Sequence, residues 1–275
     1  MPAARTSMRS MDMDLMNKTV VVTGGSRGIG YAVAKALSDE GARIVVGARD
    51  MTDELKELCE SSDVSFVPVD LATPTGPAAL VDAAVDRFGA IDVLVNNVGA
   101  SEPSSSALTF TDEQWQRIFD ITFFSAVRAV RAAVPAMRGN SGASVITISS
   151  LNARLPAPII APYSAAKAAL TNFGTALSEE LAPQGIRVNT ISPGPVRTPL
   201  WMAPGGFAHV MTEGTDTTPA EFMDRVLPES MNVATGRVSE AHEIADLVLF
   251  LASSRSANIT GADYVIDGGM LKSAS

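Results

Sequence analysis

Two side chains suited to acid–base chemistry stand close together in the sequence. Tyr163 and Lys167 are four positions apart in the stretch YSAAK, a spacing that places both on one face of a helix. The same spacing recurs at Tyr31 and Lys35, so the surroundings must decide which pair is reactive. Tyr31 directly follows a glycine-rich loop, where we expect only a partly exposed tyrosine beside a solvated lysine.

Ser150 lies thirteen residues before Tyr163, at the end of an apolar run. A free phenol has a pKa of about 10 and is a poor base at neutral pH. A cation about 4 Å away, at an effective dielectric constant of about 20, contributes roughly 4 kcal/mol. We therefore expect Lys167 to lower the pKa of Tyr163 by roughly one to three units. Such a tyrosine can protonate the alkoxide that forms when hydride reaches a carbonyl carbon, while Ser150 donates a hydrogen bond to the same oxygen.

Short apolar runs alternate with helical segments along nearly the whole chain. The runs predict seven strands, over residues 18–25, 43–48, 64–70, 91–97, 143–150, 186–192 and 262–267. Strands that alternate with helices are typical of a parallel sheet covered on both faces. We expect a flexible extension over residues 1–16 and one doubly wound α/β domain over residues 17–275. The functional loops of such a domain lie at the carboxyl ends of its strands.

The segment over residues 199–238 breaks this alternation. It has no predicted strand but many apolar residues: Leu200, Trp201, Met202, Phe207, Met211, Phe222, Met223, Val226, Leu227 and Met231. Within it we predict a short helix with Thr218 as its cap, Pro219 at its first position and Glu221 completing a capping box. A long apolar insertion after a strand is a candidate substrate lid.

The stretch TGGSRGIG joins the first predicted strand to the first predicted helix. Glycines at such a junction let the backbone approach a pyrophosphate, whose negative charge the helix N-terminus stabilises. No Gly-Lys-Ser/Thr ending follows, which disfavours an NTP-binding P-loop. We therefore expect a dinucleotide cofactor to contact the loop at Gly24, Ser26, Arg27, Gly28, Ile29 and Gly30.

The end of the second predicted strand bears on the choice between NAD and NADP. Ala48 holds the position where an acidic residue would bind the ribose hydroxyls, and Arg49 follows it. Arg27 and Arg49 would converge on a 2′-phosphate, which favours NADP. Asp50 keeps NAD open, because this carboxylate either binds the ribose or pairs with Arg49.

Composition and charge disfavour several other classes of function. The 275 residues carry a formal net charge of −9 without a run of Lys and Arg, which argues against nucleic acid or an anionic membrane as partner. No stretch approaches the roughly 18 apolar residues of a membrane-spanning helix, and residues 1–18 lack the apolar core of a secretory signal. Cys59 is the only cysteine, and His209 and His242 are isolated. We therefore expect no disulfide, no metal site and a cytoplasmic protein.

From about Asn17 to Met270 the chain closely resembles the short-chain dehydrogenase/reductase family, in particular its 3-oxoacyl-ACP reductase-like members. The resemblance rests on TGGSRGIG, VDL at 69–71, NNVG at 96–99, SS at 149–150, YSAAK, SPGPVRT at 192–198 and DGG at 267–269. It implies a seven-stranded Rossmann sheet. By this resemblance Tyr163 is the acid, Ser150 orients the substrate oxygen and Lys167 holds the nicotinamide ribose.

The same resemblance implies the remaining cofactor contacts. Asp70 would meet the adenine, and Asn97 and Gly99 would line the adenosine side. Thr198 would contact the nicotinamide end. Further cofactor contacts are implied at Leu71, Pro193, Gly194 and Val196.

Thr122 departs from the family pattern, which has an asparagine at this place in a long helix. In the family this asparagine supports a water that relays protons through the lysine. Thr122 either bonds back to the carbonyl of Ile118 or keeps a shortened relay through an extra water, which would make it a fourth catalytic residue. Two related groups do not fit, because enoyl reductases place their lysine near Ala169 and extended members have a different glycine spacing.

These observations predict an NADP-dependent oxidoreductase that acts on a ketone or secondary alcohol. The Met-rich, aromatic segment over residues 199–238 favours a mainly apolar substrate, such as a β-ketoacyl thioester, a polyketide or a terpenoid ketone. The alternative is a non-catalytic dinucleotide-binding sensor, which only Thr122 supports. Long helices over 112–138 and 161–182 are expected to pair between subunits in a homotetramer, as in the family, or in a dimer.

Overall fold

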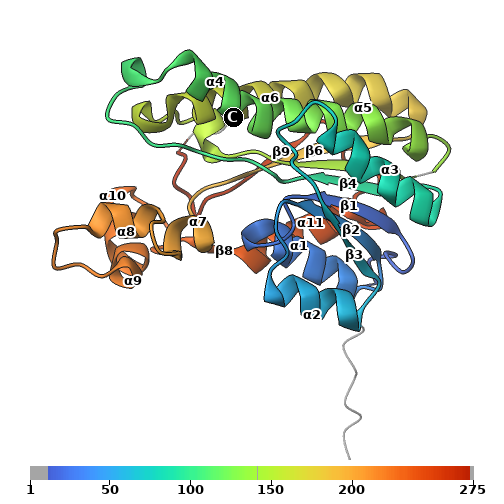
Figure 1. Cartoon of the computed structure of the whole chain (residues 1–275), viewed down its shortest axis with the longest axis horizontal. Helices are drawn as coiled ribbons and strands as arrows, with labels where there is room; N and C mark the ends of the chain where they lie inside the picture. Colours follow the sequence, from blue (N-terminus) through green and yellow to red (C-terminus); the bar gives the residue numbers. More distant parts are fainter. Residues whose placement is uncertain (1–11, 141, 273–275) are drawn as a thin grey trace, which may run out of the picture.

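A parallel β-sheet organises the chain in the computed structural model, which describes residues 12–140 and 142–272. The strand order is β3-β2-β1-β4-β5-β6-β9, and every neighbouring pair is parallel (Figure 1). The strands are β1 Thr19–Thr23, β2 Arg43–Ala48, β3 Val64–Pro68, β4 Val93–Asn96, β5 Ser144–Ile148, β6 Arg187–Pro193 and β9 Asp263–Ile266. The predicted seven-stranded doubly wound sheet is confirmed.

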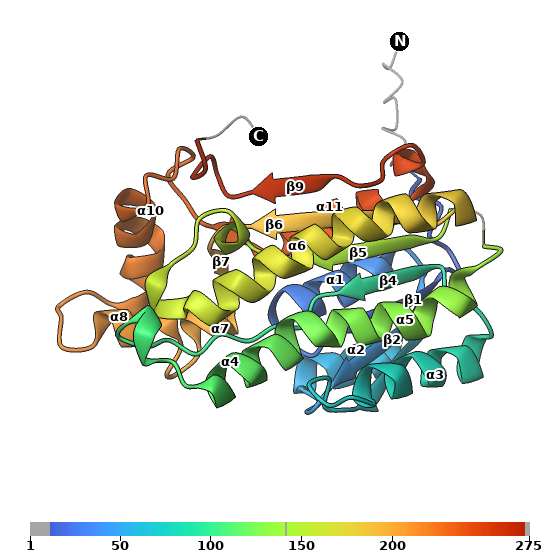
Figure 2. The ribbon, with the colours of Figure 1, turned by 90° about the horizontal axis from the view of Figure 1, so that it is seen from above.

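Helices cover both faces of this sheet (Figures 1 and 2). One face carries α1 Gly28–Asp39, α2 Asp53–Ser61 and α11 Ala241–Ala252, and the other carries α3 Gly76–Phe88, α4 Asp112–Phe119, α5 Ser125–Met137 and α6 Ala161–Leu181. Because successive side chains of a strand point to opposite faces, Val20 and Val22 pack in one core and Val21 packs in the other. Both cores are continuous apolar layers, which explains why the strands are apolar at nearly every position.

The long helix predicted over residues 112–138 is interrupted. Between α4 and α5 the chain forms a π-helical turn, η2, over Asp120–Phe124, so the predicted long helix is present but contains a turn that the sequence did not predict. Ser125 Oγ donates to the carbonyl oxygen of Ile121 at 2.6 Å within this turn. The extra residue of a π turn rotates the side chains that follow, and such turns are frequent at functional sites.

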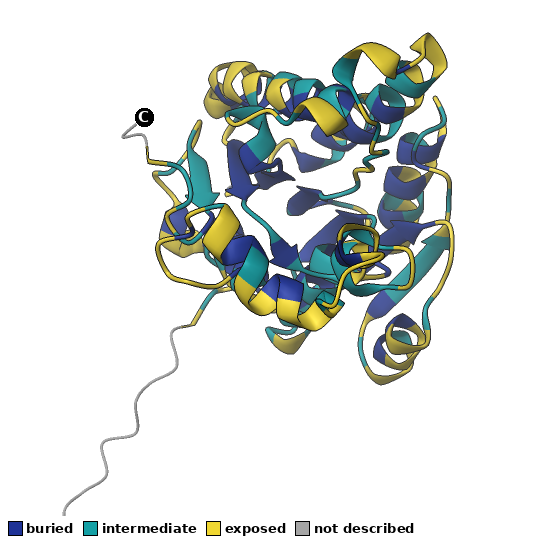
Figure 3. Cartoon of the chain, turned by 90° about the vertical axis from the view of Figure 1, so that its left-hand side faces the viewer, coloured by how far each residue is buried: buried dark blue, intermediate teal, exposed yellow. Residues whose placement is uncertain are grey.

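The segment over residues 199–238 lies beside the carboxyl end of the sheet, and we call it the lid segment after its predicted role (Figure 1). It contains α7 Pro199–Met202, α8 Phe207–Thr212, α9 Pro219–Glu221, the π turn η6 Phe222–Val226 and α10 Leu227–Ser230. These short helices share a small core of Ala208, Phe222, Met223, Leu227 and Val238. Residues of α8, η6 and α10 are buried in this core, whereas no residue of α7 or α9 is buried, so much of the segment is exposed (Figure 3).

A short ladder that the sequence did not predict closes the base of the lid. Strand β7, Val196–Arg197, pairs in parallel with β8, Ser239–Glu240. Arg197 Nε donates to Glu240 Oε1 at 3.0 Å across the ladder, and its guanidinium also pairs with Asp224 of η6. The β7–β8 pairing therefore holds the first and last residues of the lid segment close together, next to the end of β6.

The cap of α9 forms as predicted, but the capping box does not. Thr218 Oγ1 accepts a hydrogen bond from the backbone N–H of Glu221 at 3.1 Å, and Pro219 is the first helical residue. The Glu221 carboxylate points the other way, because Arg225 Nη2 donates to it at 2.7 Å. An ion pair one turn along the helix has replaced the reciprocal bond to the cap.

Several short elements complete the described chain. Within the predicted extension over residues 1–16, residues 1–11 lie outside the described residues, whereas Leu15 is 2% exposed and packs in the core. Among the described residues no helix is long and apolar enough to cross a membrane. The 3₁₀ turns are η1 Ala107–Thr109, η3 Leu151–Ala153, η4 Pro158–Ile160, η5 Ala182–Gln184 and η7 Ser254–Ser256.

Candidate active site

The glycine loop between β1 and α1 has a backbone that other residues would not tolerate. Gly24 and Gly28 have φ angles of +68° and +57°, a region that side chains with a Cβ rarely adopt. A Cβ at Gly30 would lie 2.3 Å from the carbonyl oxygen of Gly24. No side chain caps the N-terminus of α1, so the first backbone N–H groups, which include that of Ile29, are available to an anion. These features fit the pyrophosphate of a dinucleotide.

Asn97 fixes this loop from the neighbouring strand. Its Nδ2 donates to the carbonyl oxygens of Thr23 at 2.9 Å and of Gly24 at 3.0 Å. The backbone N–H of Asn97 donates to Thr23 Oγ1 at 2.9 Å. The amide predicted to line the adenosine side thus ties the end of β4 to the end of β1, at the point where the strand order reverses.

Two arginines lie in or near the loop. Arg27 precedes α1 and Arg49 follows β2, and both side chains are exposed. Neither forms an ion pair with a described residue, and Asp50 does not pair with Arg49. Ser26 is buried, and its carbonyl accepts from Thr52 Oγ1 at 2.9 Å.

The other predicted cofactor residues also lie at the carboxyl ends of strands. Asp70 is exposed after β3, and its carboxylate accepts from the backbone N–H of Ala72 at 3.0 Å. The side chain of Leu71, 3% exposed, belongs to the core, so only its backbone can face a ligand.

The stretch after β6 meets the glycine loop from the other side. Thr198 lies against Gly28, because a Cβ there would be 3.5 Å from the Thr198 side chain. Gly194 packs tightly, because a Cβ added at this position would lie 2.9 Å from the Cβ of Asp267. Pro193 ends β6, and Val196 is buried in β7. The predicted dinucleotide contacts thus converge from strands that are distant in sequence.

Lys167 is a buried cation beside the end of β5. It is 2% exposed, and its Nζ donates to the carbonyl oxygen of Ile148 at 2.7 Å. The same nitrogen lies 5.6 Å from the centre of the Tyr163 ring, and a Cβ at Gly99 would be 3.3 Å from it. Burial lowers the pKa of the Lys167 ammonium to about 7, because a low dielectric disfavours the charged form.

The electrostatics of Tyr163 differ from those that the sequence predicts. Burial raises the pKa of the Tyr163 hydroxyl, and a hydrogen bond with Ser150 acts in the opposite sense. The expectation that Lys167 lowers the pKa of Tyr163 is wrong for the protein groups alone. The ammonium group of Lys167 donates to the carbonyl oxygen of Ile148, and burial lowers the pKa of this group.

Thr122 is fully buried in η2 and is held by the backbone of Ala100. Its Oγ1 accepts from the Ala100 N–H and donates to the Ala100 carbonyl oxygen, both at 3.3 Å. Of the two alternatives for Thr122, the bond back to the carbonyl of Ile118 is wrong, and the proton relay through an extra water stays a prediction. A Cβ at Gly99 would lie 3.7 Å from Thr122 Cγ2 and 3.3 Å from Lys167 Nζ, so Thr122 fixes the segment beside Lys167.

Asn152 is a polar neighbour of the site that the sequence analysis missed. Its backbone N–H donates to Ser150 Oγ at 3.1 Å, and its Oδ1 accepts from Ser150 Oγ at 3.2 Å. The available signal was its position two residues after Ser150, where a short polar side chain readily bonds to its neighbours.

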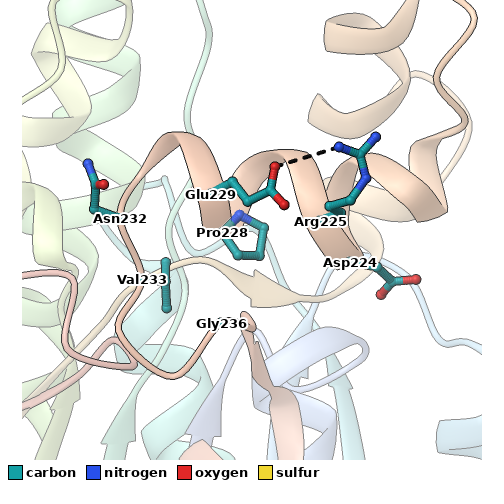
Figure 4. Close-up of a pocket in the computed structure, with 7 residues that line it drawn as sticks. All are labelled: Asp224, Arg225, Pro228, Glu229, Asn232, Val233 and Gly236. Atoms are coloured by element: carbon teal, nitrogen blue, oxygen red, sulfur yellow. Dashed lines mark ion pairs between the residues drawn. The ribbon is translucent and has the colours of Figure 1, made fainter.

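One cavity lies apart from these residues. It has a volume of about 450 Å³ and opens between η6, α10 and the loop that follows (Figure 4). Its lining residues are Asp224, Arg225, Pro228, Glu229, Asn232, Val233 and Gly236. Arg225 Nη1 lies 3.6 Å from Glu229 Oε2 there. None of the predicted site residues lines this cavity, so we do not regard it as the active site.

The buried Lys167 makes stability depend on pH in a defined direction. Its pKa is about 7 when folded and about 10.4 when unfolded, so between these values the unfolded chain binds more protons and stability rises with pH. From pH 7 to pH 9, the free energy of unfolding of the wild type should rise by about 2 kcal/mol relative to Lys167→Met. Urea unfolding at both pH values measures this.

Lys35→Met is the matched control for this experiment. Lys35 is exposed, and its bond to Asp39 raises its pKa, so the same comparison should show no rise between pH 7 and pH 9. If the difference in free energy of unfolding between the wild type and Lys167→Met also stayed constant from pH 7 to pH 9, Lys167 would remain protonated in the folded chain.

Comparisons with known proteins agree with this geometry. A family model described as enoyl-(acyl carrier protein) reductase matches residues 24–271. The 3-alpha-(or 20-beta)-hydroxysteroid dehydrogenase of Mycobacterium bovis is 35% identical over 93% of this chain and 90% of that protein. The 3-oxoacyl-[acyl-carrier-protein] reductase FabG of Chlamydia muridarum is 34% identical over 94% of this chain and 100% of that protein.

A solved structure is similar over nearly the whole chain. L-sorbose reductase from Gluconobacter frateurii, crystallised with NADPH and L-sorbose, superposes with a TM-score of 0.88 at 35% identity, covering 96% of this chain and 100% of the other. Sequence, fold and site geometry therefore agree, and the chain belongs to the short-chain dehydrogenase/reductase family of oxidoreductases.

Proposed function

We propose that the chain is an NADP-dependent oxidoreductase that interconverts a ketone and a secondary alcohol through Ser150, Tyr163 and Lys167. The observation that carries the proposal is their convergence at the carboxyl end of β5, beside a glycine loop that fits a pyrophosphate. A bound NADPH would supply a hydride to the carbonyl carbon. The residues of the chain hold the carbonyl oxygen and supply the proton.

Proton transfer to the substrate oxygen is the step assigned to Tyr163. As a C–H bond forms at the carbonyl carbon, the C=O π electrons move to the oxygen, and the Tyr163 hydroxyl donates its proton there. Ser150 donates a hydrogen bond to the same oxygen as its charge grows. Lys167, with a pKa of about 7, can either carry or release a proton at neutral pH, which suits it to restoring the proton of Tyr163.

The preference for NADP over NAD is supported by the two exposed arginines. Arg27 lies within the glycine loop and Arg49 follows β2, both without carboxylate partners among the described residues, and Ala48 stands where a ribose-binding acid would be. A 2′-phosphate would satisfy both guanidinium groups.

A mainly apolar substrate is supported by side chains around the site, not by the lid as a whole. Most apolar lid residues pack in the small lid core. Leu155 and Ile159, in the loop between Ser150 and Tyr163, are 45% exposed, and Leu200, just beyond Thr198, is 54% exposed. Aliphatic side chains left exposed beside a polar site favour a substrate with an apolar body.

Two other readings have less support. The enoyl reduction named in the family-model description would need a lysine near Ala169. The sensor alternative depended on Thr122, whose hydroxyl is engaged by Ala100 and does not disturb Ser150, Tyr163 or Lys167. We therefore favour neither.

Assembly and location follow the family pattern in this proposal. Trp115, Phe119, Phe123 and Phe124 form a chain of ring contacts along α4 and η2, and Phe124 is 36% exposed. An aromatic surface on long helices supports pairing between subunits of a homotetramer or dimer. The acidic chain with one cysteine fits the cytoplasm.

Tyr163→Phe removes the proposed acid. We expect NADPH consumption to fall at least about 100-fold with whichever carbonyl compound the wild type reduces in a panel of a steroid ketone, an acetoacetyl thioester and L-sorbose. NADPH affinity should change less than about threefold. Tyr31→Phe, the control from the second Tyr-Lys pair, should keep full activity. Turnover within tenfold of the wild type in Tyr163→Phe would exclude this role.

Arg49→Ala tests the proposed cofactor preference. Loss of a charge-assisted bond to the 2′-phosphate should weaken NADPH binding about tenfold or more and leave NADH binding nearly unchanged. Titration of the intrinsic fluorescence with each cofactor measures both, and Arg87→Ala, an exposed arginine paired with Asp63, is the control. Tighter binding of NADH than of NADPH by the wild type would overturn the preference.

A further inference from the structure

Ser150 sits in a closed pattern of hydrogen bonds with Asn152. Ser150 ends the loop after β5 and caps the 3₁₀ turn η3, where its Oγ accepts from the backbone N–H of Asn152 at 3.1 Å. The side chain of Asn152 returns to the same oxygen, with Oδ1 3.2 Å from Ser150 Oγ. Ser150 is 8% exposed, so water does not freely compete for these bonds.

The orientation of the Asn152 amide is determined by its other partner. Nδ2 of Asn152 lies 3.0 Å from the carbonyl oxygen of Leu155, and a carbonyl can only accept. The NH₂ group must therefore face Leu155, and the amide oxygen must face Ser150. Because an amide oxygen only accepts, Ser150 is the donor in the bond to Asn152.

Ser150 has a single proton, and two acceptors compete for it. One is Asn152 Oδ1, and the other is the hydroxyl oxygen of Tyr163, whose pKa the neighbouring Ser150 hydroxyl acts to lower. Ser150 cannot donate to both at once. While its proton lies on Asn152, Ser150 can only accept from Tyr163 and cannot stabilise a phenolate.

We propose that Asn152 is a positioning residue that holds the Ser150 proton away from Tyr163 until a substrate oxygen takes it. The inference rests on the proposed roles of Ser150 and Tyr163. A carbonyl oxygen that enters the site offers a better acceptor as its negative charge grows, so the proton moves from Asn152 to the substrate. Before that, Tyr163 stays protonated and ready to donate.

The proposal predicts how Tyr163 titrates when the competing acceptor is removed. In Asn152→Ala the backbone N–H to Ser150 remains, but the amide oxygen is gone, so Ser150 donates to Tyr163 without giving up another bond. The pKa of Tyr163 should fall by about 0.5 to 1, which corresponds to the loss of one neutral hydrogen bond. In Asn152→Asp an ionised carboxylate holds the Ser150 proton more tightly, and the pKa should rise.

The experiment is a titration of tyrosinate absorbance, with and without saturating NADP⁺, and it needs no turnover. Tyr31 and Tyr264 are the other tyrosines, so the same titration of Tyr163→Phe variants, subtracted from each curve, isolates Tyr163. Opposite shifts in Asn152→Ala and Asn152→Asp support the proposal. No shift in either variant, or shifts of the same sign as expected for a loosened loop, would overturn it.

Ser150→Ala provides the matched background. Because this background lacks the Ser150 hydroxyl, adding Asn152→Ala should leave the pKa of Tyr163 unchanged. A shift as large as the one measured with Ser150 present would show that Asn152 acts on Tyr163 by another route, and it would refute the proposal. If Asn152→Ala does not fold, Asn152→Asp can be compared in the wild-type and Ser150→Ala backgrounds instead. The proposal predicts a larger rise in the pKa of Tyr163 when Ser150 is present. Failure of the carbonyl panel would count against the proposed reaction but would not affect these titrations.

Discussion

The buried ammonium of Lys167, held on the carbonyl oxygen of Ile148, is the interaction on which the site depends. Lys167 is 2% exposed and has no carboxylate partner among the described residues, so its charged form costs stability, and one backbone carbonyl at 2.7 Å offsets only part of that cost. The residues around the lysine accommodate it. Gly99 leaves room beside Nζ because it has no side chain, and Thr122 fixes the backbone next to Gly99.

The parallel sheet explains how the other groups reach the same place. All seven strands of the main sheet run in one direction, so the loop after β1, the turn after β5 and the base of the lid open at one edge. Asn97 bridges β4 to the glycine loop, and Thr198 meets that loop at Gly28. A displacement of the glycine loop would therefore also displace Asn97 and Thr198. These contacts connect the proposed cofactor site to the base of the lid segment.

Much of this arrangement could be predicted from sequence because it depends on local patterns. Apolar runs located the seven strands, and the glycine loop and the set of Ser150, Tyr163 and Lys167 were predicted from residue type, spacing and the family resemblance. The π turn at Asp120–Phe124 and the β7–β8 ladder were missed, because both depend on contacts between distant segments. The direction of the Tyr163 pKa was wrong for a similar reason: spacing places two side chains on one face, whereas burial and the partner of Lys167 decide their charges. Asn152 was missed because only the geometry shows that its amide oxygen faces Ser150.

A crystal structure of the chain with bound NADP⁺ would test the central claim most directly. The expected result places the nicotinamide ring beside Tyr163 and Ser150, a ribose hydroxyl within hydrogen-bond distance of Lys167 Nζ, about 2.7 to 3.2 Å, and the 2′-phosphate between Arg27 and Arg49. A nicotinamide ring remote from Tyr163, or a Lys167 that contacts only Ile148 in the complex, would contradict it.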